Sequence, residues 1–239
     1  MARFFVDADE LTKEQVLLTG ENAAHAKVLR LKNGEEVVLC DGQGNECVCT
    51  VEDALQLRVQ TRRASVTEPG IIARVYIAMP KADKLEHVIQ KATELGAYEI
   101  VTFPSARCIS RPDEKSLNKK LERWQKIAAS AAEQCGRGRI PKVTVLGSYA
   151  DALASAANSD LAIVFYENEH AVTLHDALCE RQYNSISLLT GPEGGFEVSE
   201  IEQAAAAGLR VCTLGSRILR CETAPLCALS AVMYDAGEF

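Results

Sequence analysis

Short apolar runs separated by turn residues characterise the start of the chain. Glu36–Cys40 carries paired valines, Asp41–Asn45 contains two glycines, and Cys47–Val51 is again apolar and β-branched. A glycine- and asparagine-rich turn between two such runs predicts a hairpin. Asn22–Leu31 has alanine and leucine at helical spacing and predicts a short helix. We predict a small β-barrel-like domain over residues 1–70.

After Gly70 the pattern changes to strands that alternate with amphipathic helices. The apolar residues of segment 85–95 recur on one helical face, and Gly96 follows them. The predicted strands cover residues 75–79, 100–103, 143–146, 161–165, 186–189 and 211–214, and a closing helix covers residues 223–234. Strands alternating with helices imply a parallel sheet covered on both faces. We therefore predict an α/β domain over residues 71–239.

Three polar segments predict where helices begin. Ser116 precedes a long run whose apolar side includes Trp124. Ser148–Asp151 and Ser199–Glu202 have the spacing of capping boxes, in which two side chains satisfy backbone N–H groups at the start of a helix. We expect a helix to begin at each of these segments.

Charge is distributed unevenly along the 239 residues. The net charge is −7, which by itself argues against a nucleic-acid partner. However, the segment from Arg107 to Lys142 contains ten basic and four acidic residues, so that it carries +6 and the rest of the chain −13. Such a run is either a solvated helix face or a surface that binds polyanions.

Nine cysteines are scattered along the chain, with no C-x-x-C pair and no neighbouring histidines to complete a zinc site. We expect buried, reduced thiols and no metal. No apolar run approaches the roughly 20 residues that a membrane span needs, and acids follow soon after Met1 without an apolar signal core. We expect a cytoplasmic protein.

Two glycine- or arginine-containing segments interrupt the alternation, and each follows a predicted strand. Leu188–Phe196 places three glycines and a proline directly after a strand, which predicts a tight loop that a ligand can approach closely. It lacks both the G-x-G-x-x-G spacing of dinucleotide sites and the Gly-Lys-Ser/Thr of phosphate loops. Leu214–Pro225 carries Arg217, Arg220 and Glu222 at the start of the last helix. Loops at the carboxyl ends of parallel strands are where α/β proteins bind ligands.

Together the two segments strongly resemble the trefoil-knotted methyltransferases of the SPOUT superfamily. L-L-T-G-P-E-G-G-F followed by L-G-S-R-I-L-R-C-E-T-A is similar to the RsmE-type family, whose members make N3-methyluridine in 16S ribosomal RNA. Three further motifs follow in the family's order, so the resemblance covers most of the chain: His25 with residues 28–31, residues 90–96, and residues 131–137 with Pro141.

The resemblance implies a domain whose last segment threads through a loop to form a knot, an exception to the rule that chains do not knot. It also implies a homodimer whose sites are completed by the partner chain, and an N-terminal domain similar to a PUA-type RNA-binding barrel. Ser216 stands where family members often have proline, which changes loop stiffness only. The two loops are then expected to bind S-adenosylmethionine through Leu189, Thr190, Gly191, Glu193, Gly194, Gly195, Leu214, Gly215, Leu219, Arg220, Thr223 and Ala224.

The expected reaction assigns roles to three residues. A sulfonium donor releases a neutral thioether, so positioning supplies most of the acceleration. Uridine N3 carries a proton that must be removed, and we predict that Arg220 stabilises the resulting uracil anion. Glu193 or Glu222 is predicted to accept the proton or to orient Arg220. The alternative for Arg220 is a structural ion pair with Glu222.

The expected partner is 16S ribosomal RNA within an assembling small subunit, and the predicted RNA-binding residues are Arg30, Arg62, Arg63, Arg107, Arg137 and Arg139. Two alternatives stay open. One is a knotted RNA-binding or ribosome-assembly factor without catalysis, against which the intact glycine loop argues. The other is a knotted methyltransferase acting on another RNA, for example on transfer-RNA ribose 2′-O.

Overall fold

The chain forms two compact units, and each is described by itself. The computed structural model describes residues 1–53, 55–180 and 182–239. The first unit comprises residues 1–68 and 132–140, and the second comprises residues 69–131 and 141–239. The sequence division at residue 70 did not include segment 132–140 in the first unit.

The first unit is built on a five-stranded sheet with the strand order β1-β3-β4-β5-β2. β1 pairs with β3 in parallel, and the other pairings are antiparallel. Its elements are β1 (Ala2–Phe5), the 3-10 helix η1 (Ala8–Thr12), β2 (Gln15–Leu17), α1 (Gly20–Leu29), β3 (Glu36–Cys40), β4 (Asn45–Asp53) and β5 (Gln56–Ala64). The predicted hairpin is confirmed as β3 and β4. The edge strands β1 and β2 were missed, because three or four residues are too few to display a period.

Buried charge holds segment 132–140 within the first unit. The Arg137 guanidinium is 2.7 Å from Glu68 Oε2, and only 3% of Arg137 is exposed. The backbone N–H groups of Gly138 and Arg139 each donate to Glu68 Oε1 at 3.0 Å. A Cβ on Gly138 would lie 2.4 Å from the Ser65 Cβ, so only glycine allows this close approach.

The second unit contains a six-stranded sheet with the order β11-β9-β10-β6-β7-β8, in which every pairing is parallel. The predicted α/β class is confirmed. Its strands are β6 (Ile72–Ala78), β7 (Glu99–Phe103), β8 (Lys142–Val145), β9 (Leu161–Phe165), β10 (Ser185–Thr190) and β11 (Arg210–Cys212). Its helices are α2 (Lys84–Glu94), α3 (Glu114–Cys135), α4 (Tyr149–Ala156), α5 (Leu174–Cys179), α6 (Val198–Ala206) and α7 (Ala224–Asp235).

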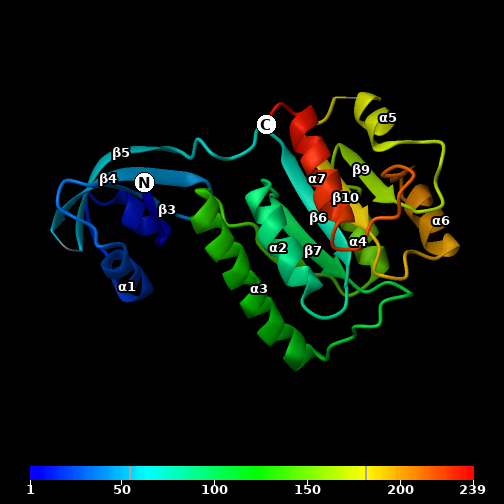
Figure 1. The fold of residues 1–239 in the computed structure, drawn as a ribbon, viewed down its shortest axis with the longest axis horizontal. Helices are drawn as coiled ribbons and strands as arrows, with labels where there is room; N and C mark the ends of the chain where they lie inside the picture. The colour runs from blue at the N-terminus through cyan, green and yellow to red at the C-terminus, as the bar shows by residue number, and fades with distance from the viewer. Residues whose placement is uncertain (54, 181) are drawn as a thin grey trace. The chain divides into compact units, whose positions relative to one another are not determined.

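Helices cover both faces of this sheet, with α7 on β10 and β6 and α4 on β10, β6 and β7 (Figure 1). All five residues of β9 are buried, as a central parallel strand covered on both faces requires. The short helix α5 was not predicted from the sequence. Knotting of the C-terminal segment stays a prediction.

Helix beginnings follow the predicted capping chemistry at one segment and depart from it at two. Ser148 caps α4, because its hydroxyl accepts the Asp151 N–H at 3.1 Å. α3 begins before Ser116, and Asp113 Oδ1 accepts the Ser116 N–H at 2.8 Å. At α6 the capping box is formed by Glu197 and Glu200, two residues before the predicted one.

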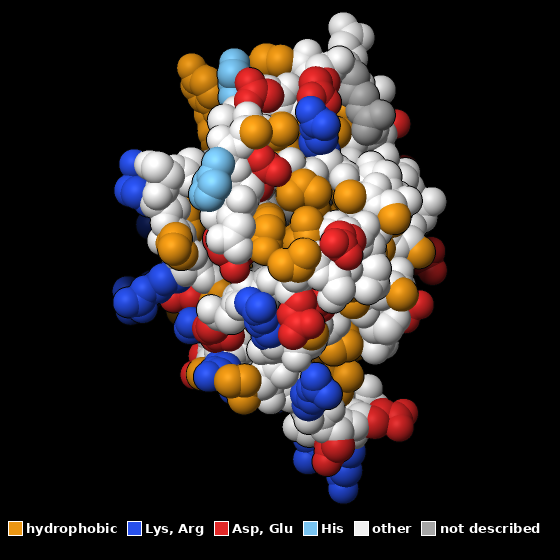
Figure 2. Space-filling model, turned by 90° about the vertical axis from the view of Figure 1, so that its right-hand side faces the viewer, with side chains coloured by type: hydrophobic (Ala, Val, Ile, Leu, Met, Phe, Trp, Pro, Cys, Tyr) orange, Lys and Arg blue, Asp and Glu red, His pale blue; other side chains and the backbone are white. Residues whose placement is uncertain are grey.

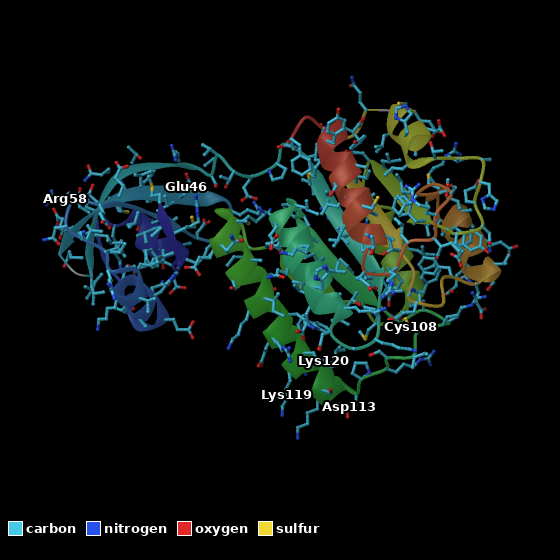
Figure 3. The ribbon with its side chains drawn as sticks, viewed as in Figure 1. Glu46, Arg58, Cys108, Asp113, Lys119 and Lys120 are labelled. Carbon is cyan, nitrogen blue, oxygen red and sulfur yellow. The ribbon has the colours of Figure 1, made fainter. Side chains whose placement is uncertain are left out.

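Glu46 is a buried carboxylate on β4 (Figure 3) that binds two arginines of the first unit. Its oxygens lie 2.8 Å from Arg3 and 2.9 Å from Arg63. Burial raises the pKa of Glu46, but hydrogen bonds from Arg3, Arg63 and Ser65 bring it below its ordinary value of 4.5. The carboxylate therefore stabilises the fold above about pH 4.5, and this contribution is lost as the pH falls through the lower folded-state pKa.

We expect Glu46→Ala to lower the stability of the first unit by about 3 kcal/mol at neutral pH, because a charged cluster loses its central partner. Hydrogen exchange of the β3, β4 and β5 amides measures this locally, which suits a chain of two units. Glu36→Ala, at an exposed position of β3, serves as the control and should change stability by less than about 0.5 kcal/mol. Equal exchange in both variants would contradict the role given to Glu46.

Candidate functional site

A cavity of about 650 Å³ lies in the second unit. Its walls come from segments that follow β6, β9, β10 and β11. These four strands are consecutive in the sheet, in the order β11-β9-β10-β6, so their carboxyl ends meet at one edge. Figure 2 shows the face of the molecule that lies at the right of Figure 1. Apolar side chains gather at the middle of this face, with acidic and basic side chains around them.

The glycine-rich segment after β10 forms one wall and folds back on itself. The Gly195 N–H donates to the Pro192 carbonyl at 3.0 Å, and Gly195 has a φ of +66°. A Cβ on Gly195 would lie 2.2 Å from Glu167 Oε1, and one on Gly191 would lie 3.2 Å from the Gly195 backbone. Both glycines therefore permit a turn that side chains would force apart.

The arginine-containing segment before α7 forms the facing wall. The Arg220 carbonyl accepts the N–H groups of Thr223 and Ala224 at 2.8 and 2.9 Å, which turns the chain into the helix. The side chains of Arg217 and Arg220 are exposed, and within the described residues neither makes a hydrogen bond or an ion pair. Ile218, between them, is 87% exposed. Two unneutralised guanidinium groups thus stand at the cavity.

Lys84 links the two walls. Its Nζ atom lies 3.1 Å from Glu193 Oε1 and 3.1 Å from Glu222 Oε2. Hydrogen bonds with Glu222 and then Glu193 raise the pKa of Lys84, so the ammonium stays protonated. Burial raises the pKa of both carboxyls, but hydrogen bonds with their own backbones, their neighbours and Lys84 bring it below the ordinary value. All three groups are charged at neutral pH.

The carboxylate of Glu222 therefore binds Lys84, and the alternative pairing of Arg220 with Glu222 is wrong. Within the described residues, neither Glu193 nor Glu222 forms a hydrogen bond or an ion pair with Arg220, so neither orients it in this way. The neighbouring Cys221 is a protonated thiol, since burial and its hydrogen bond to Glu222 raise its pKa to about 12.

Most of the expected cofactor-binding residues lie together at this cavity. Ten line it: Thr190, Gly191, Glu193, Gly194, Gly195, Leu214, Gly215, Leu219, Arg220 and Ala224. Leu189 is fully buried in β10, and Thr223 is the exposed N-cap residue of α7. Six lining residues outside the two loop segments were not expected from the sequence, namely Lys84, Phe165, Tyr166, Glu167, His170 and Thr213. Their only signal was a position directly after a strand or before a helix.

Among the expected RNA-binding residues, Arg107 belongs to the second unit and contacts the glycine-rich segment of the cavity. Its guanidinium donates to the Gly194 carbonyl at 2.8 Å, and its side chain is 46% exposed. The basic run continues along α3, where Lys119 and Lys120 are exposed and extend away from the helix (Figure 3). Arg107 is thus both the first residue of the basic segment 107–142 and a neighbour of the cavity.

The other five arginines belong to the first unit and differ in availability. Arg30 is exposed at the left-handed C-cap of α1. Arg62 donates to the carbonyls of Leu11, Thr12 and Lys13, and Arg63 binds Glu46. Arg137 is buried against Glu68, and Arg139 donates to the Gln43 carbonyl. Structural roles therefore account for Arg62 and Arg137, and we do not retain these two as RNA contacts.

Two kinds of feature are absent from the described residues. No group of three or more histidine, cysteine, aspartate or glutamate side chains is arranged to hold a metal ion there. The same residues include no helix with the length and apolar character needed to cross a bilayer.

The chain is similar to known proteins over most of its length. Residues 69–233 match the family model described as "RNA methyltransferase domain", and residues 18–60 match "RNA methyltransferase PUA domain". Ribosomal RNA small subunit methyltransferase E from Bacillus subtilis (strain 168) is 37% identical over 251 residues, covering 98% of this chain and 97% of the relative.

Two solved structures with a bound methyl donor are similar. Ribosomal RNA small subunit methyltransferase E from Neisseria gonorrhoeae, bound to S-adenosyl methionine, has a TM-score of 0.84 and 31% identity, covering 98% of this chain and 97% of that one. A putative methyltransferase from Legionella pneumophila, in complex with SAM, has a TM-score of 0.82 and 28% identity, covering 97% and 96%. The chain belongs to the family of RNA methyltransferases defined by this domain and its associated PUA domain.

Proposed function

We propose that this chain transfers the methyl group of S-adenosylmethionine to N3 of a uridine in 16S ribosomal RNA. The observation that carries the proposal is the cavity between the two loops, in a chain similar over nearly its whole length to a methyltransferase E with bound donor. The name of that relative supports small-subunit ribosomal RNA as the substrate. The choice of uridine N3 comes from the resemblance of the loop motifs.

The residues at the cavity fit the donor. Its volume, about 650 Å³, lies within the range of 300–1,000 Å³ typical of small-molecule sites. Phe165, Leu214 and Leu219 give it apolar walls suited to an adenine ring. Gly191 and Gly195 place no side chain on one wall at their own positions, so the backbone there can contact the ligand directly. When bound, the donor supplies an electrophilic methyl group on a sulfonium.

Arg220 is the proposed catalytic residue. Uridine N3 becomes nucleophilic on losing its proton, and the negative charge then spreads over the neighbouring carbonyl oxygens. An exposed guanidinium without an internal partner can stabilise that anion at no cost of breaking an ion pair. Glu193 and Glu222 are weaker candidates for the proton acceptor, because a lowered pKa reduces the basicity of a carboxylate.

For RNA contact we propose Arg107 beside the cavity, the exposed lysines of α3, and Arg30, Arg63 and Arg139 of the first unit. Phosphate neutralisation by such residues makes binding salt-dependent. We further propose that the protein acts as a homodimer on an assembling small subunit, in the cytoplasm where subunits form.

Nucleoside mass spectrometry tests the proposed reaction. Wild-type protein incubated with S-adenosylmethionine and small subunits from cells lacking its gene should produce 3-methyluridine in 16S ribosomal RNA. Methylation of a ribose 2′-O instead would transfer the assignment to another RNA methyltransferase activity. Absence of donor binding in calorimetry would favour the non-catalytic RNA-binding factor.

Gly195→Val should weaken donor binding about tenfold or more, because it places a β-branched residue at positive φ beside Glu167. Calorimetric titration with S-adenosylmethionine gives the affinity, and circular dichroism verifies folding. Gly208→Val is the matched control, since Gly208 has a φ of +88° and open space around its Cβ. Similar donor affinities for both variants would mean that the glycine turn does not form the binding wall.

Arg220→Ala should lower kcat about a hundredfold, as expected for removal of one group that stabilises a developing anion. Single-turnover methylation, with donor affinity measured in parallel, separates this loss from weaker binding. Arg217→Ala removes an equal charge from the same loop and should cost less than about tenfold. If Arg220→Ala retains kcat within about a factor of two, Arg220 has no role in the chemistry.

A further inference from the structure

We propose that Lys84 is a positioning residue of this site, because its single ammonium binds one carboxylate from each of the two loops that form the cavity walls. The inference rests on the proposed function and assigns a role to a residue outside the glycine and arginine motifs. Lys84 stands at the start of α2, and it lines the cavity itself. It therefore joins a third segment to the two loops.

Each carboxylate is fixed by more than one donor. Glu193 Oε1 lies 3.1 Å from Lys84 Nζ and also accepts the Lys81 N–H at 3.0 Å. Glu222 Oε2 lies 3.1 Å from Lys84 Nζ and accepts the Cys221 thiol at 3.2 Å. Cys221 Sγ is in turn 3.6 Å from Lys84 Nζ. Such convergence differs from an ordinary surface ion pair, in which two mobile side chains meet in solvent.

The cation is needed to bring these two carboxylates together. Both oxygens contact the same nitrogen, so they lie within about 6 Å of each other, where like charges repel unless a cation lies between them. The three side chains keep between 20% and 31% of their surface exposed. Without the ammonium, repulsion would separate the two loops.

The cluster also sets the sign of the charge at one side of the cavity. Lys84, Glu193 and Glu222 together carry one net negative charge, whereas Arg217 and Arg220, on the same loop as Glu222, are positive. A negative cluster complements a sulfonium, and a positive guanidinium complements a uracil anion. Lys84 therefore holds Glu193 and Glu222 in place, and the cluster keeps the net negative charge that favours a cationic donor.

Removing the ammonium has a predictable effect on pH dependence. The charged and titratable groups that face one another here are Lys84, Glu193, Glu222, Cys221 and Arg220. Lys84 lowers the pKa of both carboxyls, so a neutral residue at position 84 lets them take up protons at higher pH. The acid limb of the rate profile should then shift to higher pH, which loss of packing alone would not cause.

The experiment compares Lys84→Met, Lys84→Arg and the control Lys81→Met. Lys81 is an exposed neighbour that contacts Glu193 through its backbone, so its side chain is dispensable in this arrangement. Lys84→Met should raise the Kd for S-adenosylmethionine at least about tenfold and move the acid limb upward. Lys84→Arg should restore both to within about threefold of wild type, and Lys81→Met should match wild type.

Hydrogen exchange supplies a measurement that requires no donor. In Lys84→Met the amides of both loops, such as those of Gly195 and Ala224, should exchange faster than in wild type. Unchanged exchange in both loops, or an unchanged pH profile in a variant that binds donor like wild type, would overturn the role of Lys84. Failure of the wild type to bind donor would instead refute the proposed function, while the exchange data would still decide whether Lys84 positions the loops.

Discussion

Parallel pairing of β11, β9, β10 and β6 is the constraint on which the rest of the second unit depends. Because all four strands run in the same direction and lie side by side, the segments that follow them must emerge at one edge of the sheet. Residues separated by more than a hundred positions, such as Lys84 and Glu222, thereby come within hydrogen-bonding distance. All five residues of β9 are buried, so apolar packing on both faces of the sheet stabilises this arrangement.

At that edge, glycines allow the chain to turn tightly and charged side chains hold the turn in place. Gly191 and Gly195 allow the segment after β10 to turn tightly. Because these two residues have no side chain, their backbone groups are accessible at the cavity. The buried ring of Phe196 anchors the end of this loop, and polar interactions with neighbouring segments hold the rest. The Arg107 guanidinium on the Gly194 carbonyl and the Lys84 ammonium on Glu193 supply them. Flexible backbone is thus held at a few defined points.

The sequence predicted those features whose residues are contiguous in the chain, and it did not predict those that depend on contacts between distant segments. The strands of the second unit, and ten of the twelve expected cofactor residues, came from runs of apolar residues and from two motifs that are contiguous in sequence. Lys84, Glu167 and His170 escaped notice, because they reach the cavity only through strand order. The packing of segment 132–140 with residues 1–68 had no local signal either, since the partner of Arg137 is Glu68, far away in sequence. Arg62 and Arg137 were predicted to bind RNA because charge in a sequence reveals neither the hydrogen bonds of Arg62 nor the burial of Arg137.

The cations at the cavity differ in whether a carboxylate neutralises them, and this difference determines which charged groups the cavity can bind. Lys84 contacts two carboxylates and stays protonated, so it can neither accept a proton nor offer its full charge to an anion. Arg220 has no partner within the described residues, so its charge remains available. A site with all its cations neutralised would stabilise no developing anion, and one with none neutralised would repel a cationic donor. Lys84, anchored between two carboxylates, and Arg220, which has no such partner, together meet both requirements.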